Sequence, residues 1–192
     1  MAKPRVLVPV MTDFEEIEFV TVVDVLRRAG ITVVTAGLSP NPIAGAHGIQ
    51  VHADASISEV EPDGFDAIAL PGGKGTPILR EDRRVAALIR SLQARGQVVA
   101  AICAAPTVLS DLGLLKGRNA TSHPSKRSEI ACGRYLEKAV VVDGQVLTSR
   151  GAGTALAFAL DLAARLVGVE KAEEVAMAVL ADWEPAGAAP AR

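Results

Sequence analysis

The sequence predicts a single α/β domain built on a mostly parallel sheet, and three observations support this prediction. Short β-branched apolar runs alternate with longer stretches in which apolar residues recur at helical spacing. The first run, residues 5–10, is almost continuously apolar, as is typical of a parallel strand buried on both faces. The chain has 192 residues, of which 49% are hydrophobic and 22% charged, and this length is sufficient for a core without disulfides or metals.

The N-terminal half is expected to begin with a βαβ unit. The acidic pair Glu15-Glu16 marks the first turn of a helix after the strand at 5–10, and Gly30 marks the end of that helix. A second strand over residues 32–38 completes the unit. Prolines then turn the chain into a hairpin or edge excursion over residues 43–53.

The rest of the chain continues the alternation of strands and helices. We expect strands over residues 67–70, 98–102, 119–122, 139–143 and 145–149, and helices over 80–95, 104–113, 154–167 and 170–180. No repeat or long linker divides the chain. We therefore expect one domain over residues 1–183, followed by a flexible Ala/Pro/Gly-rich tail over 184–192.

Charge and composition argue against several classes of function. The 20 Lys and Arg residues nearly balance the 22 Asp and Glu residues, so the net charge is −2, and no basic cluster suits a phosphate backbone or an anionic membrane. Nucleic acid is therefore not expected as a dedicated partner. Without a secretory leader or a run of about 18 apolar residues, the chain is expected to be cytoplasmic and not bound to membranes. Two cysteines, Cys103 and Cys132, are too few for a disulfide framework and are treated as free thiols.

Cys103 stands where α/β proteins bind their ligands, just beyond the carboxyl end of a predicted strand. It follows residues 98–102 at a turn lined by small residues, and Pro106 suits the first turn of the next helix. The helix dipole and the free N–H groups at such a position favour the thiolate. A small buried hydrophobic cysteine is an equally good interpretation of this segment taken alone.

Two glycine-rich segments lie at other strand ends. Pro71-Gly72-Gly73-Lys74-Gly75 frees backbone N–H groups to point into the same crevice, as an oxyanion site requires, although the glycines also suit a plain turn. Neither this segment nor Gly151-Ala152-Gly153-Thr154 has a complete nucleotide-binding fingerprint. No cofactor is therefore expected.

A histidine could complete a thiol site. His47 and His52 lie in the predicted hairpin, whereas His123 follows the short strand at 119–122 and can reach the crevice. A lone histidine is more often a satisfied polar residue, but a cysteine followed by a histidine at strand ends suits nucleophilic thiol chemistry. The histidines and cysteines have no metal-ligand spacing, so no metal site is expected.

The acidic cluster after the first strand has two interpretations. Glu15 and Glu16 fit stabilisation of the helix dipole without any chemistry. Glu18 instead shares a helical stripe with apolar residues at positions 22, 25 and 29, so its carboxyl projects with an apolar face. Such surroundings raise the pKa of a carboxyl group and let it donate a hydrogen bond at neutral pH.

Six motifs in this order resemble the ThiJ/PfpI family, most closely the branch that holds the Parkinsonism-associated protein deglycase and bacterial YajL. The resemblance extends from about residue 4 to about residue 182. The motifs are Glu15-Glu16-Ile17-Glu18, residues 24–30, Leu70-Pro71-Gly72-Gly73, residues 101–106, Thr121-Ser122-His123-Pro124 and residues 148–154.

The resemblance implies a flavodoxin-like three-layer α/β sandwich, of the kind shared with class I glutamine amidotransferases, and a homodimer. By this similarity Cys103 is the reactive thiol on a strained elbow, Glu18 the protonated carboxyl that hydrogen-bonds its sulfur, and His123 the nearby histidine. The N–H groups of Gly73 and Ala104 match the oxyanion site.

Other positions are less informative. Arg28 and Arg150 match recurring family positions whose role, with an anion or with another subunit, is left open. Cys132 falls outside the motifs and is interpreted as structural or incidental. The chain departs from the animal members at Gly45-Ala46-His47, where those can place an arginine and further cysteines. Behaviour that depends on those peripheral cysteines is therefore not expected here.

The motifs leave three functions open. The first is cofactor-independent glyoxalase or deglycase chemistry, in which methylglyoxal, glyoxal or an early glycation adduct of a protein or nucleotide forms a hemithioacetal with Cys103, with a stress-protective role. The second is an oxidative-stress sensor or redox-regulated chaperone that uses oxidation of Cys103 to a sulfinic acid. A cysteine peptidase or amidase is less favoured, because related peptidases place a histidine where Ala104 stands.

Overall fold

A seven-stranded sheet forms the centre of the computed structural model, which describes residues 3–186. Its strand order is β10-β11-β7-β6-β1-β2-β5, and every neighbouring pair is parallel except β10 with β11. The strands are β1 (Arg5–Val10), β2 (Thr32–Gly37), β5 (Ala55–Ser56), β6 (Ala67–Leu70), β7 (Val98–Ile102), β10 (Val140–Asp143) and β11 (Val146–Ser149). The five longer parallel strands, in the order β2-β1-β6-β7-β11, follow the flavodoxin-like pattern and confirm the predicted fold class.

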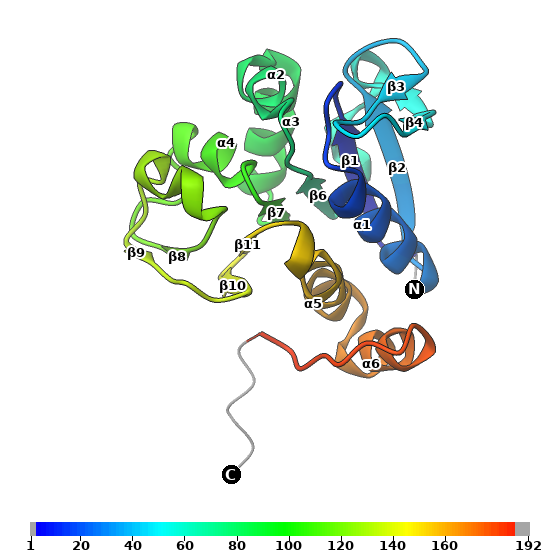
Figure 1. Ribbon diagram of the computed structural model, residues 1–192, viewed down its shortest axis with the longest axis vertical. Coiled ribbons are helices and arrows are strands. Elements are labelled where there is room, and N and C mark those ends of the chain that lie inside the picture. Colours follow the sequence, from blue (N-terminus) through cyan, green and yellow to red (C-terminus); the bar gives the residue numbers. More distant parts are fainter. Residues whose placement is uncertain (1–2, 187–192) are drawn as a thin grey trace.

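Helices cover both faces of the sheet (Figure 1). On one face α1 (Glu16–Arg28) packs against α5 (Ala155–Val167), and α6 (Val169–Ala178) packs on α5 from outside. The other face carries α2 (Thr76–Glu81), α3 (Arg83–Ala94) and α4 (Pro106–Asp111). Because both faces are covered, strands such as β6 and β7 are buried at every residue, which explains their unbroken apolar sequences.

The shorter elements agree with the prediction in some places and differ from it in others. The helix expected over 80–95 is divided into α2 and α3 at Asp82, whose side chain accepts hydrogen bonds from the N–H groups of Arg84 (2.8 Å) and Val85 (3.4 Å) and so caps α3. Strands β3 (Ile43–Ala44) and β4 (Gln50–Val51) form the expected antiparallel hairpin. Strand β8 (Asn119–Ala120) is shorter than predicted and pairs with β9 (Arg134–Tyr135) outside the main sheet. Among the described residues, 3-10 helices span Ile57–Glu59, Pro62–Gly64, Pro124–Glu129 and Ala152–Thr154.

The C-terminal segment returns to α5 after α6. The Ala186 N–H donates a 2.7 Å hydrogen bond to Asp161, a buried carboxyl on α5. Residues 187–192 of the predicted flexible tail lie outside the described residues. Within residues 3–186 no helix has the length and apolar character needed to cross a membrane.

Candidate active site

Cys103 occupies a tight elbow between β7 and α4, with a backbone φ of +63° that non-glycine residues rarely adopt. Two hydrogen bonds hold this conformation. The Cys103 N–H donates to Ser149 O at the end of β11 (3.0 Å), and the Cys103 carbonyl accepts from the His123 N–H (2.7 Å). The elbow is therefore fixed by two segments that are distant in sequence.

Glu18 lies against the cysteine from the α1 side and is completely buried. Its Oε2 accepts a 2.8 Å hydrogen bond from the Gly72 N–H, and its carboxyl also hydrogen-bonds the Cys103 thiol. Its Oε1 has no nitrogen or oxygen partner among the described residues. This arrangement agrees with the prediction that the Glu18 side chain follows the apolar face of its helix.

Gly72 lies where these two side chains meet. A Cβ built on it would be 2.7 Å from Cys103 Cβ, 2.9 Å from Glu18 Oε2 and 3.0 Å from Ala104 N. Only glycine therefore lets the carboxyl, the thiol and this loop come together. Sequence reasoning identified the Gly72-Gly73 pair but assigned no separate role to Gly72.

The two acidic groups of the site are coupled. Burial raises the pKa of Glu18 to about 7, although hydrogen bonds from Cys103 and Gly72 act to lower it. Burial also raises the pKa of the Cys103 thiol, and the adjacent Glu18 carboxylate raises it further. The pair therefore keeps at least one proton near neutral pH, either on Glu18 or on sulfur.

This result modifies the expectation of a thiolate favoured by a helix N-terminus. Helix α4 has only six residues, and burial beside a carboxylate opposes ionisation of the sulfur. The N–H groups of Ala104 and Gly73 hydrogen-bond the sulfur and lower the pKa of the Cys103 thiol, but they do not outweigh burial. When Glu18 is protonated, its charge no longer opposes the thiolate, and it can donate a hydrogen bond to sulfur instead.

The N–H groups of Gly73 and Ala104, which the sequence predicts as oxyanion donors, both face the Cys103 sulfur. Gly73 has a φ of +116°, and a Cβ on it would be 2.5 Å from both Asp13 O and Glu15 N. Gly73 is therefore held against the segment that leads into α1. The two N–H donors can stabilise negative charge on an oxygen atom bonded to a carbon that Cys103 has attacked.

His123 approaches the site from the other side. A Cβ built on Gly151 would be 3.5 Å from His123 Cδ2 and 3.9 Å from Cys103 Sγ, so the imidazole edge and the sulfur face the same glycine. The His123 Nδ1 is 2.8 Å from Ser125 Oγ. Nδ1 also accepts a 3.3 Å hydrogen bond from the Ser125 N–H, so in the neutral imidazole Nε2 carries the proton and can donate it.

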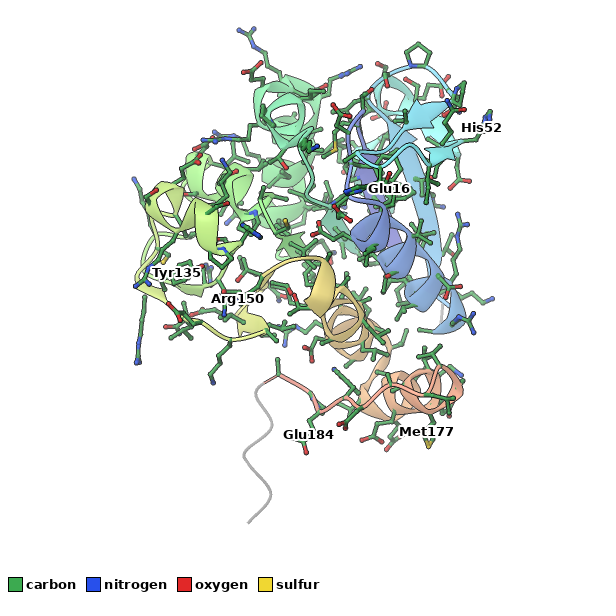
Figure 2. All side chains as sticks on the ribbon, in the orientation of Figure 1. Glu16, His52, Tyr135, Arg150, Met177 and Glu184 are labelled. Carbon is green, nitrogen blue, oxygen red and sulfur yellow. The ribbon has the colours of Figure 1, made fainter. Side chains whose placement is uncertain are left out.

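The remaining predicted positions lie outside this group. Arg28 forms a 2.7 Å ion pair with Asp24 near the end of α1 opposite to that of Glu18. Arg150, labelled in Figure 2, precedes Gly151. Its side chain donates a long hydrogen bond, 3.4 Å, to the Glu137 carbonyl. Cys132 is half-buried against the core and takes no part in the site.

His47 and Glu16 are functional candidates that the sequence patterns did not reveal. Glu16 is 5% exposed and accepts hydrogen bonds from the His47 N–H (2.6 Å) and from His47 Nδ1 (2.9 Å). With Glu15 they place potential metal-ligand atoms within 4.8 Å of one another. Because His47 and Glu16 already bond each other, we interpret the group as an ion pair and not as a metal site. No signal in the sequence links these residues, which lie 31 positions apart.

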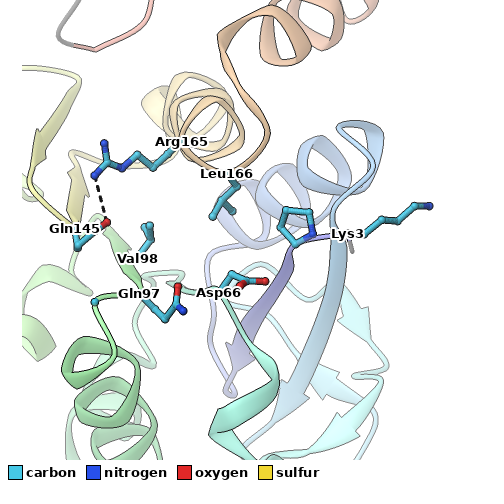
Figure 3. A pocket seen from close by; sticks show the side chains of 9 residues that line it. Lys3, Asp66, Gln97, Val98, Gln145, Arg165 and Leu166 are labelled. Carbon is cyan, nitrogen blue, oxygen red and sulfur yellow. Dashed lines mark hydrogen bonds between the residues drawn. The ribbon is translucent and has the colours of Figure 1, made fainter. Parts of the chain in front are cut away.

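A separate cavity of about 470 Å³ opens at the amino ends of the strands, opposite to the thiol site (Figure 3). It lies where β1, β6, β7 and β11 begin, and Arg165 donates a 3.2 Å hydrogen bond to Gln145 Oε1 at its rim. None of the predicted site residues lines this cavity. It is therefore distinct from the thiol site at the carboxyl ends of the strands.

Comparisons with known proteins identify the family of the chain. The DJ-1/PfpI family model matches residues 4–165. Protein dj-1beta of Drosophila melanogaster is 44% identical over 170 residues, covering 86% of this chain and 91% of that protein. The glutathione-independent glyoxalase DJR-1.2 of Caenorhabditis elegans is 38% identical over 161 residues, covering 83% and 86%. A solved structure of oxidized Toxoplasma gondii DJ-1 is 37% identical, with a TM-score of 0.90, covering 93% of this chain and 99% of that one.

Proposed function

The chain belongs to the DJ-1/PfpI family, and from this premise we propose that it is a glutathione-independent glyoxalase whose nucleophile is Cys103. The observation that carries the proposal is the contact between the Cys103 thiol and the buried Glu18 carboxyl, which the Gly72 N–H orients. A relative named as a glutathione-independent glyoxalase gives additional support.

The first step forms a bond between the Cys103 sulfur and the aldehyde carbon of methylglyoxal or glyoxal. The π electrons of the carbonyl move to its oxygen, where the N–H groups of Gly73 and Ala104 stabilise the developing charge. The thiol proton passes to Glu18, whose raised pKa of about 7 suits a group that accepts and returns a proton near neutral pH. Glu18 then returns this proton to the carbonyl-derived oxygen, and the product of the step is a hemithioacetal.

The second step converts the hemithioacetal into a hydroxy-acid thioester. Glu18 removes the proton from the carbon bonded to sulfur and returns it to the neighbouring carbon, while the hydroxyl proton moves from the oxygen of the first carbon to that of the second. His123, as a donor through Nε2, can assist this second transfer. The first carbon is thereby oxidised and the second reduced, so no external electron acceptor is needed. Water then releases the hydroxy acid, lactate in the case of methylglyoxal, and regenerates the thiol. Early adducts of dicarbonyls with amines of proteins or nucleotides could enter through the same hemithioacetal, which is the basis for proposing deglycase activity as well.

The test is conversion of methylglyoxal to lactate by the purified protein, without glutathione and in a buffer without amines. We expect Cys103→Ala to abolish turnover and Glu18→Gln to reduce it by at least about a hundredfold, since proton transfer by a positioned group contributes roughly 10²–10⁴ in rate. Cys132→Ala is the matched control, because that thiol lies outside the site, and it should retain activity. Turnover that survives Cys103→Ala would refute the mechanism.

A second candidate function is sensing of peroxide through Cys103, with a stress-protective or chaperone role. The specific observation in its favour is Glu18 Oε1, a buried atom with no hydrogen-bond partner among the described residues, on the carboxyl group that lies against Cys103. A protonated Glu18 could donate to an oxygen of a sulfinate formed when hydrogen peroxide oxidises the thiol. Treatment with peroxide separates the two functions. A sensor gains an activity, such as suppression of aggregation of a client protein, whereas a glyoxalase loses turnover as two oxygen atoms are added to Cys103.

We also propose that the protein is a homodimer. Support comes from Ile17 and Val20 on α1 and Ile49 on the hairpin, large apolar side chains that are 56%, 47% and 55% exposed. A second copy would cover this apolar surface beside the site.

A further inference from the structure

The turn between β3 and β4 is built around the carboxylate of Glu16. Two donors of His47 bind that carboxylate, its N–H on Oε1 (2.6 Å) and its Nδ1 on Oε2 (2.9 Å). A Cβ on Gly45 would overlap Glu16 Oε1, so the turn also needs glycine at this position. Glu16 is buried, whereas two-thirds of the His47 side chain is exposed. The turn thus places a solvent-accessible imidazole over a buried carboxylate.

The segment that carries Glu16 is bonded to this turn on one side. The Asp13 N–H donates to Ala44 O (2.8 Å), and the Ala46 N–H donates to Phe14 O (2.9 Å). Phe14 also forms bridges with both Gly45 and Gly73. Residues 13–16 therefore lie between the hairpin turn and the loop that supplies the proposed oxyanion donors.

The same segment is bonded to the oxyanion loop on its other side. The Glu15 N–H donates to Gly72 O (3.0 Å), and the Gly75 N–H donates to Asp13 O (3.0 Å). Gly72 in turn orients Glu18 through its own N–H. A displacement of residues 13–16 would therefore move the Gly72 peptide and the Glu18 carboxyl together.

We propose that His47 is a positioning residue for the candidate active site: its side chain adds the Nδ1 bond to the backbone N–H bond on Glu16, and this added bond holds residues 13–16 against the Gly72–Gly75 loop. The expected effect on turnover rests on the proposed function, whereas the expected effect on the position of residues 13–16 does not. His47 touches neither Cys103 nor Glu18, so its effect is on the geometry of the donors and not on the chemistry of a step.

The charges around His47 give this arrangement a dependence on pH. Glu15 and Glu16 face it from the start of α1, and Lys74 faces it from the oxyanion loop. The hydrogen bond and charge of Glu16 raise the pKa of His47, with a further contribution from Glu15, while Lys74 acts in the opposite direction. The charged interaction is thus present below the usual histidine pKa and is lost as pH rises through the higher pKa of the folded protein.

The test compares His47→Ala with His47→Arg, which keeps a cationic donor, and with His52→Ala. His52 is an exposed histidine just after β4 for which the described structure gives no hydrogen bond, so it is the matched control. Amide hydrogen exchange is followed at Glu15 and Gly75, the two N–H groups that join residues 13–16 to the oxyanion loop. This measurement needs no turnover, so it remains informative even when the proposed glyoxalase activity is absent.

For His47→Ala we expect exchange at both amides to be about fivefold faster, and kcat for methylglyoxal about fivefold lower with KM changed less than twofold. His47→Arg should restore both, and His52→Ala should leave both unchanged. The ratio of wild-type to His47→Ala kcat should fall towards one as pH rises through the His47 pKa. Unchanged exchange at Glu15 and Gly75 in His47→Ala, or equal changes in His52→Ala, would overturn the proposal.

Discussion

Replacement of Gly72 by alanine tests whether the approach of thiol and carboxyl depends on a missing side chain. The new Cβ would lie 2.7 Å from Cys103 Cβ and 2.9 Å from Glu18 Oε2, both well inside normal contact distance. Cys103 cannot move away easily, because both of its backbone polar groups are bonded. Overpacking of this kind costs about 1–3 kcal/mol of folding free energy.

The same overlap should affect turnover more than stability. Relief of the contact would shift Glu18 or the elbow by a substantial part of 1 Å, and misplacement on that scale costs about a hundredfold in rate. We therefore expect Gly72→Ala to lower kcat/KM for methylglyoxal by about two orders of magnitude. Urea denaturation measures the loss of stability, and the glutathione-free lactate assay measures the loss of rate.

Gly153→Ala is the matched control, because a Cβ at that position meets nothing within 4 Å and its backbone is not left-handed. It should stay near wild type in both measurements. Our reasoning about Gly72 would be refuted by a Gly72→Ala protein with the wild-type urea midpoint and a kcat/KM within twofold of wild type.

Three further predictions follow from the same geometry. Wild type should lose up to about 3 kcal/mol of stability relative to Glu18→Gln between pH 4.5 and pH 7, since over this range the carboxyl ionises in the unfolded chain but stays protonated in the folded protein, where its pKa is about 7. Urea titrations that give parallel pH profiles would contradict this. The rate of alkylation of Cys103 by iodoacetamide, followed against pH, should show two apparent pKa values in wild type and one in Glu18→Gln, because Cys103 and Glu18 titrate as a pair. A single value in both proteins would mean that the two groups are uncoupled. Val20→Glu should shift the proposed homodimer towards monomer in size-exclusion chromatography, whereas Met177→Glu, at an exposed position on α6, should not. A dimer that tolerates Val20→Glu would exclude α1 from the interface.

Much of the fold was predictable because burial on both faces leaves a direct pattern in the sequence. Strands β1, β6 and β7 occupy the predicted ranges, and each is a nearly continuous apolar run. The two-residue strands β5 and β9 are too short to have a periodicity of their own. Their existence depends on neighbouring segments, so local sequence could not predict them.

The candidate site was predictable where a residue's environment follows from its own element. The burial of Glu18 follows from the helical stripe, and the strand-to-helix turn at Cys103 follows from a strand that ends among small residues. The strained elbow at that turn was implied only by the family resemblance. The role of Gly72 instead depends on contact with Glu18, 54 residues away in sequence. The Glu16–His47 pair likewise joins elements that share no local pattern, and Glu16 had been interpreted only as a charge at a helix terminus.

The backbone bonds of Cys103 also constrain how this protein could be recombined with its relatives. Backbone hydrogen bonds from Cys103 to Ser149 and from His123 to Cys103 hold the elbow. They join the segments 101–106, 121–124 and 148–154, although long stretches of chain separate these segments. A chimera that takes one of these segments from another family member would inherit a cysteine supported by mismatched partners. Chimeras that exchange helices outside these three segments should therefore still fold. Chimeras that take one of the three segments from a different homologue than the other two should lose the conformation of the elbow.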